Sequence, residues 1–129
     1  MSTLTASVDL RPTARSVVTA RRVVGELLTA WAAPHDRLDA ELLVSEVVAN
    51  VVDHAGGESV LTLEVSLSDT WLRISVADGS AIRPVVRELN HEAPRGRGMQ
   101  LVEAIADRWG AEDHQGGKRV WLELHTPEV

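Results

Sequence analysis

A helical run with three polar side chains on one face is the feature that most constrains this chain. Between residues 38 and 51, apolar residues recur at helical spacing, which predicts a long helix. Glu46, Asn50 and His54 lie four residues apart in this helix and therefore share one face. Because burying an unpaired polar group costs roughly 1–3 kcal/mol, we expect this face to point at a ligand, a metal ion or its own members.

Composition narrows the class of protein. With 129 residues, of which 44% are hydrophobic and 25% charged, we expect a single domain over residues 1–129 with its own core. The net charge of -6 disfavours direct nucleic-acid binding, which rests on cationic contacts to phosphate. The sequence has no cysteine, which excludes disulfides and thiolate metal ligands. It has neither a long apolar run nor an apolar signal core, so we expect no membrane association and a cytoplasmic protein.

The remaining periodicity predicts further strands and helices. Weak alternation indicates a strand at 3–10, and helical spacing followed by Pro34 indicates a helix at 13–32. Asp36 is a good N-cap for the polar-faced helix, which we expect to end before Gly56. Beyond it we predict a hairpin of strands 59–67 and 71–77, a long loop at 78–97, a helix at 98–109, and a final hairpin of strands 109–114 and 118–124. This order predicts an α+β fold, a two-layer α/β sandwich with helices on one face of a mixed, mainly antiparallel sheet.

Two further segments have the composition of a binding site. Asp78 follows a predicted strand and precedes a turn in Val76-Ala77-Asp78-Gly79-Ser80. The segment from Arg95 to Val102 places two arginines and two glycines at a helix start. Backbone N–H groups at a helix N-terminus bind anions, and glycine lets a phosphate approach the backbone. A short glycine-rich turn is a weak signal alone, but it gains weight beside Asn50 and Asp78.

The three segments together resemble the ATPase fold shared by gyrase B, histidine kinases and MutL, known as the GHKL or Bergerat fold. Within it, the chain looks most like the small anti-sigma factor serine kinases of high-GC bacteria. The resemblance covers about residues 11–124. It rests on Ser45-Glu46-x-x-x-Asn50-x-x-x-His54-Ala55, Val76-Ala77-Asp78, Gly96-Arg97-Gly98-Met99-x-Leu101-Val102, Asp107-Arg108-Trp109-Gly110 and Gly117-Lys118-Arg119-Val120-Trp121.

The resemblance implies a role for each matching residue. Asn50 is expected to ligand a Mg²⁺ ion that bridges the ATP phosphates, and Glu46 to act as the general base toward a serine hydroxyl. Asp78 is expected to accept a hydrogen bond from the adenine amine. The segment from Asp78 to Arg95 corresponds to the ATP lid. The nucleotide-binding residues that the resemblance implies are Asn50, Asp78, Gly79, Arg95, Gly96, Arg97, Gly98 and Met99.

The resemblance also implies partners. Proteins of the anti-sigma factor kinase family hold a sigma factor or phosphorylate an anti-anti-sigma (STAS-type) antagonist domain on serine, and they often form homodimers. We therefore expect an ATP-binding anti-sigma regulator with protein-serine kinase activity. The alternative is a non-catalytic, nucleotide-dependent binding module on the same fold. A histidine-phosphorylating sensor kinase is disfavoured, since the chain is too short for the dimerising helical domain that holds the phospho-acceptor.

Two departures from the family pattern bear on nucleotide affinity. Ser80 and Ile82 stand where the first glycine box has glycines, which predicts a stiffer lid. In Gly117-Lys118-Arg119, we interpret Arg119 as occupying the place of a threonine that supports adenine through the aspartate. Weakened or rearranged adenine binding is then expected. His54, near the helix C-terminus, is more simply a structural cap than a catalytic group.

Overall fold

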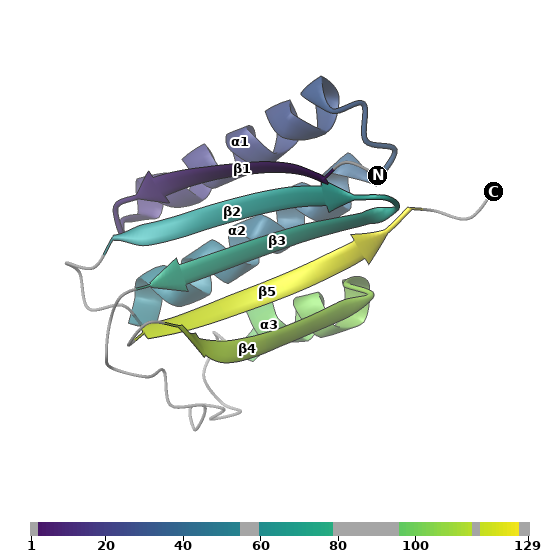
Figure 1. The fold of residues 1–129 in the computed structure, drawn as a ribbon. Helices are drawn as coiled ribbons and strands as arrows, with labels where there is room; N and C mark the ends of the chain where they lie inside the picture. Colours follow the sequence, from purple (N-terminus) through teal and green to yellow (C-terminus); the bar gives the residue numbers. More distant parts are fainter. Residues whose placement is uncertain (1–2, 55–59, 79–95, 115–116, 127–129) are drawn as a thin grey trace.

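The computed structural model describes residues 3–54, 60–78, 96–114 and 117–126, and these form two layers (Figure 1). Within these ranges, a five-stranded sheet makes one layer, and three helices cover one of its faces. No helix of the described ranges has the length and apolarity needed to cross a membrane. The elements in chain order are β1 (Thr3–Leu10), α1 (Ala14–Ala30), α2 (Arg37–His54), β2 (Leu61–Ser68), β3 (Trp71–Asp78), α3 (Gly96–Ile105), β4 (Arg108–His114) and β5 (Gly117–His125).

The sheet has the strand order β1-β2-β3-β5-β4. This confirms the predicted α+β fold with helices on one face. The sheet itself is not mixed in the described residues, because all four pairings are antiparallel. The reason is the returning helix: α3 takes the chain back along the sheet, and the β4–β5 hairpin then reverses it once more. β5 therefore enters beside β3 in the opposite direction.

Local hydrogen bonds explain where the elements begin and end. The Asp36 carboxylate accepts a hydrogen bond from the Asp39 N–H at 2.9 Å, which confirms Asp36 as the cap of α2. The predicted hairpin is confirmed as well: Ser68 and Trp71 are paired, and Asp69 adopts a positive φ of 56° in the turn. The prediction for α3 was wrong at its C-terminal end. The Asp107 N–H donates to the Glu123 carbonyl at 3.0 Å, so the chain joins the sheet before position 109.

The core lies between the helices and one face of the sheet. Alternate residues of β2, β3 and β5 point into it, as the strand period requires. Among the described side chains, α2 contributes more buried residues to the core than α1 or α3 does, so α2 forms the centre of the helical layer. Among the side chains that the structure describes, the buried hydrophobic ones are Leu10, Ala20, Val24, Leu28, Ala40, Leu43, Val44, Val47, Val48, Val51, Leu61, Leu63, Val65, Leu72, Ile74, Val76, Val102, Val120, Leu122 and Leu124.

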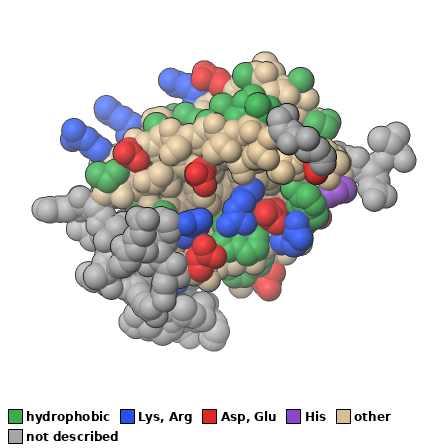
Figure 2. All heavy atoms as spheres, in the orientation of Figure 1, with side chains coloured by type: hydrophobic (Ala, Val, Ile, Leu, Met, Phe, Trp, Pro, Cys, Tyr) green, Lys and Arg blue, Asp and Glu red, His purple; other side chains and the backbone are tan. Residues whose placement is uncertain are grey.

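The opposite face of the sheet has charged and aromatic side chains over β3, β5 and β4. Glu123 accepts from Arg73 at 3.2 Å and pairs with Arg108 at 2.9 Å. The guanidinium of Arg73 lies 4.5 Å from the Trp121 ring centre, and that of Arg108 lies 3.7 Å from the Trp71 ring centre. Figure 2 views this face and shows acidic and basic side chains gathered there. These contacts link the side chains of β3, β4 and β5.

A glycine on β4 makes room for this arrangement. Gly110 pairs with Trp121, and a Cβ at Gly110 would lie 2.9 Å from the tryptophan ring. We expect Gly110→Ala to lower the free energy of unfolding by about 1–3 kcal/mol, because the ring must shift. Chemical denaturation measures this change.

Gly25 in α1 provides the control. A Cβ there would lie 2.5 Å from Glu41 Oε2 and 2.7 Å from Arg37 Nη2, which are the ends of flexible side chains. These ends can rotate away, and alanine favours a helix by up to about 1 kcal/mol over glycine. Gly25→Ala is therefore expected to be neutral or stabilising. Equal losses for the two variants would contradict the packing argument at Gly110.

Candidate functional site

Four segment ends meet at one end of the molecule. The C-termini of α2 and β3 and the N-termini of α3 and β5 lie at the same end of the sheet (Figure 1). α2 contacts both β3 and α3. The segments that hold the three sequence motifs are thus brought together by the fold.

Asp78 is the last residue of β3, and it is only 5% exposed. Strand alternation places it on the same face as Leu72, Ile74 and Val76, whose side chains are in the core under the helices. A carboxylate at the end of an apolar row is costly to bury unless it has polar partners. Asp78 has such a polar interaction in the structure, and it lies at the end of the sheet where the segments with the sequence motifs meet.

The polar face of α2 leads toward this end of the sheet. Glu46 and Asn50 are half-buried on α2, one turn apart, and His54 is the last residue of the helix. The side chain of His54 lies outside the described residues. Within the part of the chain that the structure describes, the Glu46 carboxylate makes no hydrogen bond or ion pair. Glu46 is thus a partly buried carboxylate available to accept a proton or a hydrogen bond.

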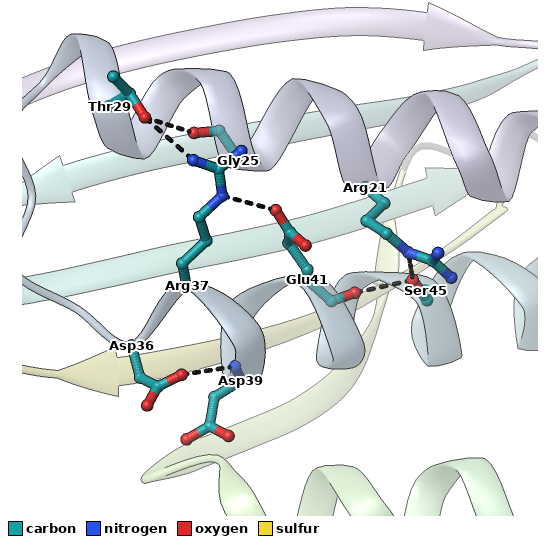
Figure 3. Close-up of polar contacts among 8 residues, drawn as sticks. All are labelled: Arg21, Gly25, Thr29, Asp36, Arg37, Asp39, Glu41 and Ser45. Carbon is teal, nitrogen blue, oxygen red and sulfur yellow. Dashed lines mark hydrogen bonds and ion pairs between the residues drawn. The ribbon is translucent and has the colours of Figure 1, made fainter.

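A polar seam between α1 and α2 holds the turn just before Glu46 (Figure 3). Arg21 Nε donates to the hydroxyl of Ser45 at 3.0 Å, and that hydroxyl donates to the Glu41 carbonyl at 2.7 Å. Ser45 is buried and directly precedes Glu46. The seam therefore links α1 to the turn of α2 that directly precedes Glu46.

A second set of contacts crosses the same two helices nearer the start of α2. Arg37 Nε donates to Glu41 Oε2 at 2.8 Å, and its Nη1 donates to the Thr29 hydroxyl at 3.2 Å (Figure 3). No role for Arg21 or Ser45 was predicted from the sequence. The sequence feature that could have indicated a role for Ser45 is a serine in an otherwise apolar helical run.

The other site residues proposed from the sequence are only partly within the described residues. Gly79, Arg95 and the lid positions Ser80 and Ile82 lie outside them. α3 begins at Gly96, so the glycine-rich segment does start a helix at this end of the sheet. Its first four residues are Gly96, Arg97, Gly98 and Met99, and the description covers their backbone but not their side chains.

The interpretation of Arg119 was wrong. Asp78 pairs with Lys118, whereas Arg119 pairs with Ala77. Successive side chains of a strand point to opposite faces, so Arg119 lies on the open face of the sheet, where its Nε is 3.7 Å from Glu112 Oε2. Lys118 is the residue beside Asp78 on the helix-covered face. The alternation within 118–124 already places Lys118 on the same face as Val120 and Leu122, and Arg119 on the other face.

The donor set fits an anionic ligand with a polar aromatic base and a hard metal ion. Asp78 supplies an acceptor, Asn50 an amide oxygen, and the start of α3 a row of backbone N–H groups. Among the described side chains there is no group of three or more His, Asp or Glu residues that could hold a metal alone. A ligand that brings its own oxygens complements the single amide of Asn50.

Comparisons with known proteins agree with this geometry. A family model described as the histidine kinase-like ATPase domain matches residues 10–124. A search of curated proteins gives no match.

Solved structures of histidine kinases are similar. A histidine kinase domain from the blue-light activated histidine kinase EL346 of Erythrobacter litoralis is 25% identical, with a TM-score of 0.56. The match covers 70% of this chain and 44% of that one, so this chain spans less than half of its length. The nucleotide-free catalytic domain of histidine kinase ThkA is 15% identical, with a TM-score of 0.59 over 95% of this chain and 99% of that one. This second likeness shows the fold alone.

Proposed function

Because the chain belongs to the histidine kinase-like ATPase domain family, we propose that it binds ATP with Mg²⁺ and phosphorylates a partner protein on serine. The observation that supports this proposal most directly is the Glu46 carboxylate, half-buried and unpaired within the described residues, one turn before Asn50. A general base needs a carboxylate that is not engaged in an ion pair of the fold, and Glu46 meets this condition within the described residues.

The nucleotide would be held by groups from three elements. Asp78 would accept a hydrogen bond from the base, and the backbone N–H groups of Gly96 to Met99 would face the phosphates. The Asn50 amide oxygen would ligand the metal ion. When bound, Mg²⁺ neutralises phosphate charge and keeps most of its coordination sites for water and phosphate.

The Asp78 assignment predicts the effect of removing one charge. We expect Asp78→Asn to weaken ATP binding by about 10–100-fold, because a hydrogen bond to a charged group contributes roughly 1.5–3 kcal/mol. A calorimetric titration with ATP and Mg²⁺ measures the change. Asp69→Asn is the matched control, since Asp69 is an exposed turn residue between β2 and β3, and asparagine tolerates its positive φ. Equal affinities for Asp78→Asn and the unaltered protein would contradict the assignment.

Glu46 is the proposed general base. It would take the proton from the serine hydroxyl as that oxygen attacks the terminal phosphorus of ATP, while the bond from this phosphorus to the bridging oxygen breaks and ADP leaves. Phosphoryl transfer otherwise depends mainly on positioning and charge neutralisation, which Asn50 and the start of α3 would supply. The Arg21–Ser45 contact supports this role by linking α1 to the turn of α2 next to Glu46.

We further propose a cytoplasmic regulator that switches between two partners. It would hold a sigma factor, or phosphorylate an anti-anti-sigma (STAS-type) antagonist domain and so release that domain. A homodimer is the proposed assembly.

The test is phosphate transfer to serine. The purified protein would be incubated with Mg²⁺, ATP labelled on its terminal phosphate, and STAS-type antagonist domains from the same genome. The proposal predicts labelled serine in at least one domain. ATP binding without labelling of any of these domains would favour the alternative, a nucleotide-dependent binding module.

A further inference from the structure

Lys118 lies beside Asp78, and the chemistry of the lysine side chain bears on which base the site can bind. The two residues are direct partners across the antiparallel β3–β5 pair. The Cβ atoms of such partners lie roughly 4.5–5.5 Å apart on the same face of the sheet. Asp78 is buried and Lys118 is half-buried, so both belong to the helix-covered end where the motifs converge.

The pair presents an acceptor next to a donor. A carboxylate can only accept hydrogen bonds, and an ammonium group can only donate them. Adenine offers its 6-amino group as a donor next to N1 as an acceptor. Guanine offers N1–H as a donor next to O6 as an acceptor, in the reversed order along the same edge.

Without Lys118, guanine O6 in a site built around Asp78 would face a carboxylate, acceptor against acceptor. The Lys118 ammonium supplies the missing donor, and its flexible stem lets it reach either acceptor. We propose that Lys118 reads the base together with Asp78, and that the pair admits guanine nucleotides as well as adenine nucleotides. This inference rests on the proposed nucleotide site and adds its base specificity.

The expected effect of replacing Lys118 is a change in the ratio of the GTP and ATP affinities. Leaving a buried polar group of a ligand unpaired weakens binding by about tenfold to a hundredfold. We expect the unaltered protein to bind GTP within about tenfold of ATP, and Lys118→Thr to weaken GTP binding relative to ATP by about tenfold or more. Calorimetric titrations with each nucleotide and Mg²⁺ give both constants.

Further measurements keep the test independent of folding effects. Arg119→Thr alters the next residue, which lies on the open face, and is expected to leave the ratio unchanged. Inosine triphosphate keeps N1–H and O6 but lacks the 2-amino group, so it should follow GTP with the unaltered protein. Lys118→Met, which keeps the length of the side chain without its charge, should behave as Lys118→Thr does, and far-ultraviolet circular dichroism verifies the fold of each variant.

The outcomes separate the two proposals. If ATP binds but Lys118→Thr leaves the ATP-to-GTP ratio unchanged, or if the unaltered protein already prefers ATP by more than about a hundredfold, the role of Lys118 is overturned and the ATP site stands. If no nucleotide binds, both this inference and the proposed function are overturned.

Discussion

Glu46→Gln is expected to lower the rate of serine phosphorylation by about 10²–10⁴-fold and to leave ATP binding nearly unchanged. Glutamine keeps the size and a hydrogen-bonding oxygen of glutamate, but it cannot take a proton from the hydroxyl. The Glu46 carboxylate has no hydrogen bond or ion pair within the described residues, so the substitution breaks no polar contact there. Initial rates of label transfer, with ATP affinity measured in parallel, report the two properties separately.

Glu64→Gln is the matched control for this prediction. Glu64 is exposed on β2, and its partner Ser75 lies on the open face of the sheet. Its replacement is expected to change neither the rate nor the affinity. If Glu46→Gln transfers phosphate as fast as the unaltered protein, Glu46 is not the base. If it loses ATP binding instead, Glu46 belongs to the nucleotide site rather than to the chemistry.

Leu43→Ala is expected to lower the free energy of unfolding by about 2–5 kcal/mol. Leu43 is fully buried in α2, where it belongs to the core between the helices and the sheet. Removing most of its side chain loses burial and leaves a cavity that a packed interior fills only in part. Chemical denaturation followed by tryptophan fluorescence measures the change.

The neighbouring residue separates burial from helix propensity. Leu42 is 39% exposed on the same helix, and Leu42→Ala makes the same chemical change. We expect it to cost less than about 1 kcal/mol, because surface substitutions usually have small effects. Similar losses for both variants would mean that α2 is not packed as described.

The architecture could be predicted because periodicity reports local structure directly. The α2 run has a helical period and the segments on either side of Asp69 alternate, so their elements were correct to within a few residues. The end of α3 was missed, because a hydrogen bond to Glu123, distant in sequence, decides where the chain joins the sheet. Residue patterns over a few neighbouring positions carry no information about such a long-range contact.

The candidate site could be predicted where residue spacing alone sets geometry. Glu46 and Asn50 share a helix face because they are four residues apart, whatever surrounds them. The roles of Arg21 and Lys118 depend on how α1 crosses α2 and on which residue of β5 pairs with Asp78. Arg119 was assigned from its place in the Gly-x-Thr pattern, whereas the β3–β5 register puts Lys118 beside Asp78 and Arg119 on the other face.

The central claim is an ATP site at the end of the sheet where α2, β3 and α3 meet. A calorimetric titration of the purified protein with ATP, with and without Mg²⁺, tests it most directly. We expect saturable binding of one nucleotide per chain that is stronger with Mg²⁺ and weakened in Asp78→Asn. No detectable heat of binding at millimolar ATP, with or without Mg²⁺ and confirmed by the absence of thermal stabilisation, would contradict the account.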